Sequence, residues 1–325
     1  MGVFGDTTVR LDPWQPEFGA EAPGLGLQGD EDAAEVKLDV ERPPESWEPV
    51  VPTNGWSPRR LVFVDGVRRL DARIVAQRDG KRFLGAFGSW GVGAVVVQDG
   101  RADFGDCTIG RTLGLGSGAM LAGVVPIGPA LTYVPYSTPD ETPDGPIFAV
   151  HEQMRFAEES AATKLADEPD TLVVGDGPLT FEHASRGSAV GYVKRILQLY
   201  LPSSLWPLLG ALPAGTRTPV FALGGRFARY AWFLRLAAPR PGDADTSGLV
   251  RMEVSAKLGA DDAVRLANAC AALVPRFQSV RGLHPRAPQN LLPIGALEGY
   301  LRRQLGDAEL VSRQIQTFIA REAKS

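Results

Sequence analysis

Two apolar runs that each end in Asp-Gly constrain this chain more than any other feature. They are RLVFVDG at 60–66 and DTLVVGDGPL at 170–179. Short apolar runs bounded by Asp-Gly are typical of buried strands. If the two strands are neighbours in one sheet, Asp65 and Asp176 emerge close together, and paired carboxylates attract hard divalent cations such as Mn²⁺ or Mg²⁺. The alternative is that each Asp-Gly only marks a turn after a strand.

The hydrophobic pattern predicts a mixed α/β domain with a largely central sheet. Short connections between the first three strands favour an antiparallel meander. Residues 115–148 are rich in Gly, Pro and Thr, and YVPYSTPDETPDGP within them is the plainest expected loop. We expect strands at 60–66, 67–77, 81–98, 170–179, 219–225, 229–237 and 248–256, and helices at 149–167, 189–201, 261–274, 293–305 and 307–322.

Composition places the folded part of the chain after an acidic N-terminal segment. Residues 1–55 are rich in Pro, Gly, Asp and Glu and indicate an extended, partly disordered arm with one short strand at 35–41, so the folded domain is expected over 56–325. Two cysteines exclude a disulfide framework and favour a reducing cytoplasm. The N-terminus does not resemble a signal peptide, and no apolar run is long enough for a bilayer.

The net charge of −4 argues against a protein that coats nucleic acid through its overall charge. It does not exclude a local basic lining for phosphate. The candidate basic residues are Arg68, Arg69, Lys194, Arg281 and Arg286, with a further group at Arg226, Arg229 and Arg235 beside Tyr230 and Trp232. Basic groups interleaved with aromatics suit single-stranded DNA, although solvated strand faces and core aromatics would leave the same pattern.

A third carboxylate is expected from the helix before the second Asp-Gly strand. That helix offers Glu152, Glu158 and Glu159, and the sequence does not separate Glu158 from Glu159. Most glutamates on such a helix are simply solvated. Of the three histidines, His151, His183 and His284, the last lies in a Pro-containing basic loop, where it could contact phosphate or transfer a proton.

Several fragments resemble the bacterial NurA nucleases. They are FVDGVRR at 63–69, VVGDGPL at 173–179, GYVKRILQLYL at 191–201, LVRMEV at 249–254 and HPRAPQNLLPIGALEGYLRRQLGD at 284–307. The resemblance extends from about residue 60 to the C-terminus, and only the last fragment is fairly specific.

The resemblance implies an RNase H-like fold, a homodimer, and Mn²⁺-dependent cleavage of DNA as a 5'–3' exonuclease and single-strand endonuclease. It also implies a HerA-type hexameric translocase as partner in the repair of DNA ends at the nucleoid. Carried over by motif, Asp65 and Asp176 match the metal-binding aspartates, Glu159 or Glu158 the helix glutamate, and His284 the C-terminal histidine. The tyrosine that some members carry before that histidine is absent, and Phe277 is the nearby aromatic residue.

Metal-assisted phosphodiester hydrolysis is the resulting hypothesis, with Lys194 and His284 contacting phosphate. Two other classes of function remain open. An actin- or hexokinase-like ATP phosphotransferase also uses Asp-Gly loops at strand ends, but usually with more Gly, Ser and Thr than VDGVRR or GDGPL offers. The second is an adaptor of a hexameric ATPase that does not cleave.

Overall fold

The computed structural model describes residues 3–12, 35–53, 55–178, 188–196, 198–225, 227–282, 284 and 286–323. Within these residues twelve strands form one mixed sheet flanked by helices, and the C-terminal region is helical. The strands are β1 (Thr8–Leu11), β2 (Val36–Lys37), β3 (Arg60–Arg78), β4 (Lys81–Gln98), β5 (Arg101–Leu115), β6 (Val125–Gly128), β7 (Leu131–Ser137), β8 (Thr171–Asp176), β9 (Ala189–Val193), β10 (Phe221–Leu223), β11 (Arg229–Arg235) and β12 (Leu249–Ser255). The α-helices are α1 (Gly145–Ala166), α2 (Trp206–Ala211), α3 (Ala260–Leu273), α4 (Leu292–Gln304) and α5 (Ala308–Glu322).

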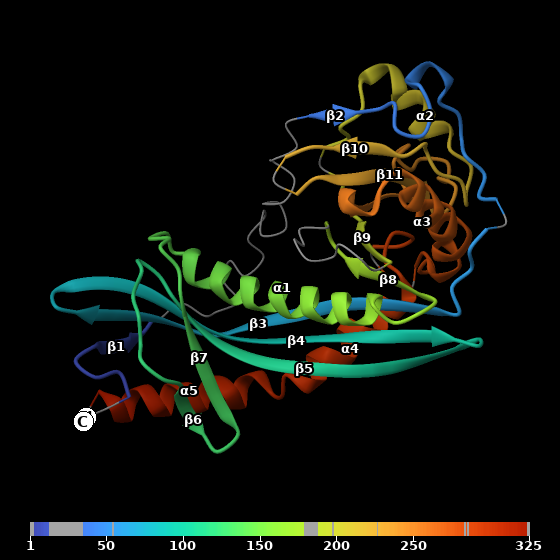
Figure 1. Ribbon diagram of the computed structural model, residues 1–325. Coiled ribbons are helices and arrows are strands. Elements are labelled where there is room, and N and C mark those ends of the chain that lie inside the picture. Colours follow the sequence, from blue (N-terminus) through green and yellow to red (C-terminus); the bar gives the residue numbers. More distant parts are fainter. Residues whose placement is uncertain are drawn as a thin grey trace.

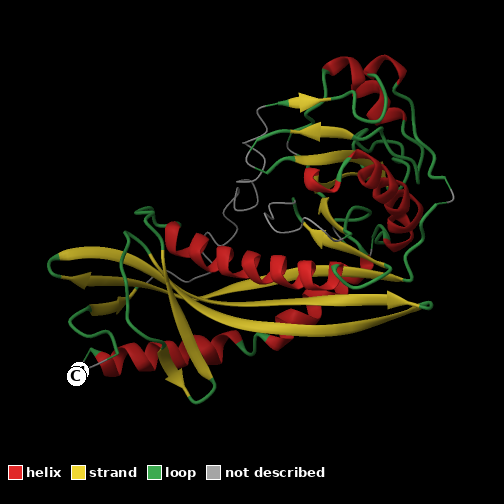
Figure 2. Cartoon of the chain, viewed as in Figure 1, coloured by secondary structure: helices red, strands yellow, loops and turns green. Residues whose placement is uncertain are grey.

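The sheet order is β2-β10-β11-β12-β9-β8-β3-β4-β5-β7-β6, and β1 pairs separately with β3. Strands β3, β4 and β5 form a long antiparallel meander, visible as the extended ribbons of Figure 2. Strands β8 and β9 run parallel to β3 and to each other. Because β3, β8 and β9 all run in the same direction, the residues that follow β8 and β9 emerge at the same edge of the sheet.

Helices cover both faces of the β3–β5 meander (Figure 1): α1 crosses one face, while α4 and α5 lie along the other. On the α1 face, Val62, Val64 and Val173 pack with Met154. Because side chains alternate along a strand, Leu61 and Phe63 point to the opposite face, where they pack with Leu297 and Leu301 of α4. Helix α3 covers the same core further along, over β11.

Three local expectations are wrong. Residues 60–66 and 67–77 form one continuous strand, because β4 pairs with β3 along its whole length and Asp65-Gly66 makes no turn. The helix expected over 189–201 begins instead as β9, because Ala189–Val193 pairs with both β8 and β12. Part of the loop expected at 133–146 is β7, which pairs with β5 and β6. Strand β5 was not foreseen.

Parts of the N-terminal segment are attached to the sheet. Residues Thr8–Leu11 pair with the distal half of β3, and Val36–Lys37 pair with β10. Glu41 receives two hydrogen bonds from Arg217, a buried arginine, at 2.7 and 3.0 Å. Residues 13–34 of the expected arm lie outside the described residues, so a boundary near residue 55 stays a prediction. Within the described chain, none of the helices combines the length and apolarity that crossing a bilayer requires.

Candidate metal centre

Strand register brings Asp65 and Asp176 to the same point on the same face. In the parallel pair of β3 and β8, Val64 lies opposite Gly175, so the next residue of each strand is an aspartate. Asp65 continues the alternation of Leu61 and Phe63, and Asp176 continues that of Leu172 and Val174, all four of which belong to the core under α4. Both carboxylates therefore point toward α4 rather than toward α1.

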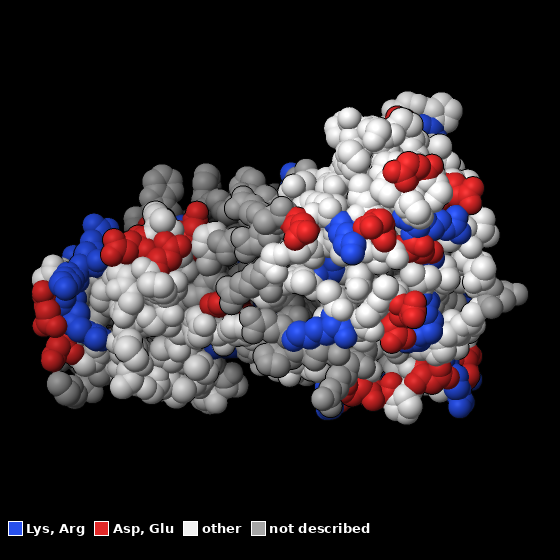
Figure 3. Space-filling view, turned by 45° about the horizontal axis from the view of Figure 1, so that its top comes forward, with Lys and Arg blue, Asp and Glu red and all other residues white. Residues whose placement is uncertain are grey.

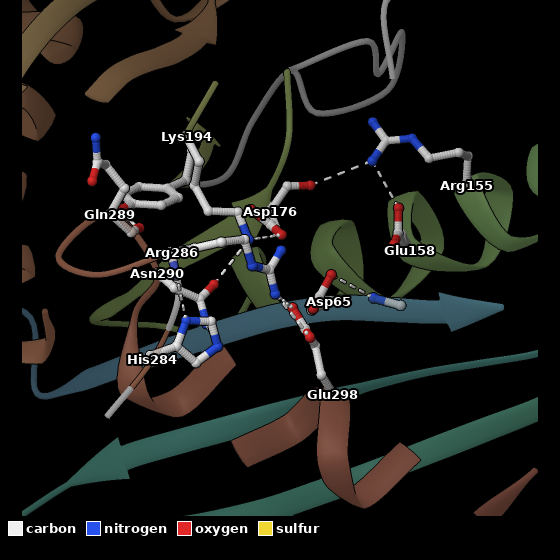
Figure 4. A network of polar contacts seen from close by, with 12 residues as sticks. Asp65, Arg155, Glu158, Asp176, Lys194, His284, Arg286, Gln289, Asn290 and Glu298 are labelled. Carbon is white, nitrogen blue, oxygen red and sulfur yellow. Dashed lines mark hydrogen bonds and ion pairs between the residues drawn. The ribbon is translucent and has the colours of Figure 1, made fainter. Parts of the chain in front are cut away.

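Glu298 of α4 completes a group of three carboxylates. One ligand oxygen from each of Asp65, Asp176 and Glu298 lies within 4.8 Å of the other two (Figure 4). Asp65 and Glu298 are buried, and Asp176 is half-buried. Glu298 is not among the ligands predicted from the sequence, although it lies inside the most specific NurA-like fragment. A signal was present: Glu298 shares the apolar stripe of Ile294, Leu297 and Leu301, where a charged residue is unusual.

Asp176 presents a buried oxygen, Oδ1, that no hydrogen bond from the described residues satisfies. Asp65 Oδ1 accepts a hydrogen bond from the Gly66 N–H at 2.8 Å, and in the described chain no other hydrogen bond to this carboxylate is found. A buried, unpaired carboxylate oxygen is costly unless a cation or donor meets it. Three clustered carboxylates, one of them with a buried oxygen that lacks a partner among the described residues, fit a hard divalent cation, which prefers oxygen ligands.

The electrostatics of the group fit the same conclusion. Burial raises the pKa of Asp65 well above its usual range, and the neighbouring carboxylates of Asp176 and Glu158 raise it further, while Lys194 acts in the opposite direction. Without a cation the site therefore opposes ionisation of its central carboxylate. A bound divalent cation would reverse that opposition, because it favours the charged form.

Lys194 is the cation that the chain itself supplies to the aspartates. It follows directly after β9, whose Tyr192 is the register partner of Asp176. Its Nζ lies 2.5 Å from Asp176 Oδ2 and donates to Asn290 Oδ1 at 3.1 Å. Since Val190 and Tyr192 point into the core under α4, Lys194 shares their side of the sheet. Its placement beside Asp176 thus depends on the segment being a strand, not the helix that was expected.

Glu158 and Glu159 lie outside this group of carboxylates. Glu158 is buried on α1, over the other face of the sheet, where Arg155 Nη1 donates to Glu158 Oε2 at 2.7 Å. Burial raises the pKa of Glu158 to about 7 although Arg155 opposes the shift. The same Nη1 lies 3.4 Å from the backbone oxygen of Asp176, so this pair braces the end of β8. Glu159 is half-buried.

His284 reaches the site through Asn290. The Arg286 N–H donates to His284 Nδ1 at 3.1 Å, and His284 Nε2 lies 3.1 Å from Asn290 Nδ2. Asn290 is almost fully buried and contacts Lys194 through its other amide atom, so one side chain connects His284 to the Lys194–Asp176 pair (Figure 4). Asn290 is not among the site residues predicted from the sequence. His183 lies outside the described residues, and His151 is half-buried on α1.

Some of the basic residues predicted to bind phosphate lie in the site, and others form contacts elsewhere in the fold. Arg286 lies in the site, where its Nη2 donates to both oxygens of Glu298 at 3.0 and 3.1 Å. Arg69 is used in the structure: it donates to Asp71 Oδ1 at 2.9 Å and to the backbone oxygen of Gly306 at 2.7 Å. Arg281 is paired with Asp243 and also donates to Ser247. Arg68 is half-buried.

The aromatic and basic group on β11 belongs to the core. Trp232, Arg229 and Arg235 are all buried, so this group lies within the fold rather than on a DNA-facing surface. Arg226 lies outside the described residues. On the face shown in Figure 3, acidic and basic side chains are interspersed over the right-hand lobe. That mixture agrees with the small net charge of the whole chain.

Comparisons with known proteins leave the family open. No family model matches the sequence, and no curated protein matches it. Among solved structures, the crystal structure of the NurA nuclease from Sulfolobus solfataricus is similar, with 11% identity over 83% of this chain and 88% of that chain and a TM-score of 0.47. A similarity of this size carries no conclusion about activity. Any functional argument must therefore come from the site.

Proposed function

We propose that this protein is a nuclease that hydrolyses DNA with a divalent cation held by Asp65, Asp176 and Glu298. The observation that carries the proposal is the approach of these three carboxylates to within 4.8 Å, with a buried oxygen of Asp176 left without a partner among the described residues. Oxygen ligands of this kind suit Mn²⁺ and Mg²⁺. A cation bound there supplies Lewis acidity to a phosphodiester.

The remaining residues of the site have roles that follow from their contacts. Lys194 holds an ammonium group beside Asp176 and would neutralise charge on a nearby phosphate. His284, positioned by Asn290, would hold or transfer a proton at a ring nitrogen. The Arg155–Glu158 pair keeps the end of β8 in place. Catalytic roles for Glu158 and Glu159 themselves stay predictions.

The finer features of the proposal depend on the resemblance of the sequence fragments. They are an RNase H-like fold, a preference for Mn²⁺, 5'–3' exonuclease and single-strand endonuclease activity, a homodimer, and a HerA-type hexameric translocase as partner. The strand arrangement supports the RNase H-like interpretation. Strands β3, β4 and β5 form an antiparallel meander, β8 and β9 run parallel to β3, and α1 lies between the meander and β8 in the sequence.

A cleavage assay tests reaction class and metal dependence together. End-labelled single-stranded DNA is incubated with the protein in Mn²⁺ and then in EDTA, and products are resolved on a denaturing gel. We expect cleavage only with the cation, and its loss in Asp65→Asn. Asp170→Asn is the matched control, because Asp170 loses the same charge at the opposite end of β8 and asparagine tolerates its positive φ of 55°.

Three outcomes would contradict the proposal in different ways. Full activity of Asp65→Asn would remove this carboxylate from the site. No cleavage by the unmodified protein under any divalent cation would favour the adaptor without nuclease activity. Nucleotide hydrolysis or phosphate transfer from ATP, with DNA left intact, would favour the phosphotransferase.

A further inference from the structure

Glu298 differs from the two aspartates of the site in already having cations of its own. Arg286 Nη2 donates to both of its oxygens, at 3.0 and 3.1 Å, and Arg302 Nη2 donates to Oε2 at 3.1 Å. Asp176, by contrast, has a buried oxygen without a partner among the described residues. The third carboxylate is thus occupied at the point where a metal ion would need it.

The two arginines are held differently. Arg302 lies one turn after Glu298 on α4, so the helix keeps this pair together. Arg286 comes from the loop that carries His284, and its side chain is 53% exposed, against 65% for that of Arg302, so exposure does not separate the two arginines. Their attachment does: a partly exposed guanidinium on a loop can move away at little cost, because surface ion pairs contribute little to stability, whereas the helix keeps Arg302 within reach of Glu298. Arg286 is therefore the partner that a competing cation would displace.

We propose that Arg286 substitutes for the divalent cation in the metal-free site, and that metal binding releases it to bind a backbone phosphate of the nucleic acid. This inference rests on the proposed metal centre. Guanidinium groups pair with phosphate as they do with carboxylate, so the released Arg286 keeps an anionic partner. The exchange also couples the two ligands: nucleic acid that engages Arg286 favours metal binding, and the metal favours nucleic acid by the same factor.

The exchange predicts effects of opposite sign in one variant. Arg286→Ala removes the competitor of the metal, so the affinity for Mn²⁺ should rise about twofold to fivefold, the range expected for a partly exposed ion pair. The same variant lacks the released guanidinium, so its affinity for single-stranded DNA in the presence of Mn²⁺ should fall by a similar factor. If Arg286 merely oriented Glu298 as a metal ligand, Arg286→Ala would instead lower both affinities.

Isothermal titration with MnCl₂ measures the first effect on the intact chain. Arg302→Ala is the matched control, since it removes the same charge from the same carboxylate, and we expect a smaller rise than in Arg286→Ala. In a Glu298→Gln background, Arg286→Ala should leave Mn²⁺ affinity unchanged, because the competition needs the carboxylate. Arg286→Lys keeps the charge on a single nitrogen, as in the observed contact, and should give a smaller rise than Arg286→Ala, provided circular dichroism shows the same fold.

Fluorescence anisotropy with a phosphorothioate single-stranded oligonucleotide in Mn²⁺ measures the second effect while slowing cleavage. The exchange is refuted if Arg286→Ala binds Mn²⁺ no more tightly than the unmodified protein, if Arg302→Ala has an equal effect, or if DNA affinity does not fall. Failure of the proposed metal centre has a separate signature, namely Mn²⁺ binding that Asp65→Asn does not weaken.

Discussion

Gly66 is the position where a single methyl group should test how closely α1 approaches the site. A Cβ built at Gly66 would lie 2.5 Å from Glu158 Oε1 and 3.0 Å from Met154 Cγ. Ordinary contacts of this kind are at 3.4 Å or more. Glu158 cannot simply swing away, because it is buried and Arg155 holds its other oxygen at 2.7 Å. Gly66→Ala should therefore displace α1 or distort β3.

The expected size follows from two opposing effects. Overpacking a buried contact typically costs about 1–3 kcal/mol. Replacing glycine by alanine restricts the unfolded chain and returns about 0.4–1 kcal/mol. The net loss of unfolding free energy is then between about 0 and 2.6 kcal/mol, centred at about 1.3 kcal/mol. In a chain of 325 residues this lowers the midpoint of thermal unfolding by about 2 °C at the centre of the range and by up to about 4 °C.

Gly175→Ala is the matched control. Gly175 lies on the adjacent strand β8, and a Cβ there would meet only the Val190 backbone oxygen, at 4.0 Å. We expect its unfolding midpoint to stay unchanged or to rise slightly. Differential scanning calorimetry in EDTA compares the two variants without any contribution from metal. If Gly66→Ala were as stable as Gly175→Ala, the close packing of α1 on β3 would be refuted.

Three further predictions concern charge and metal. The pKa of Glu158 is raised from 4.5 to about 7, so the metal-free protein should be most stable below about pH 4.5 with respect to this group and lose about 3 kcal/mol as the pH rises to about 7. Denaturant titrations across this range should show the loss, and Glu158→Gln should flatten it. Mn²⁺ at about 100 times its Kd should raise the unfolding free energy by about 2.7 kcal/mol, which scanning fluorimetry detects as a higher unfolding midpoint. An equal rise in Asp176→Asn would argue against the site. Lys194→Met should reduce cleavage at saturating Mn²⁺ by about 100-fold, and unchanged single-turnover rates would exclude a role on phosphate.

The helical expectations were largely confirmed because their signals are local. Helices α1, α3, α4 and α5 lie close to the predicted ranges, with α1 starting four residues earlier than expected. Periodic apolar residues over three or more turns specify a helix whatever lies against it. The helix predicted at 189–201 is wrong for the complementary reason, because long-range strand pairing decides the structure of this segment. Ala189–Val193 is short and apolar, and its pairing with β8 on one side and with β12 on the other made it a strand.

The sequence by itself determined which side of its own strand each of Asp65 and Asp176 occupies. Each aspartate continues the two-residue alternation of its own strand, after Leu61 and Phe63 in one case and after Leu172 and Val174 in the other. Such alternation is a property of the strand alone. Once the two strands pair in parallel and in register, the carboxylates must emerge together.

Only the tertiary structure decided which glutamate joins them. Two helices cover the two faces of this sheet, and both carry a buried glutamate close to the aspartates, Glu158 on α1 and Glu298 on α4. No local pattern states which helix packs on which face, because that depends on long-range connections of the chain. The fold places α4 on the aspartate face, and so Glu298 completes the group while Glu158 pairs with Arg155.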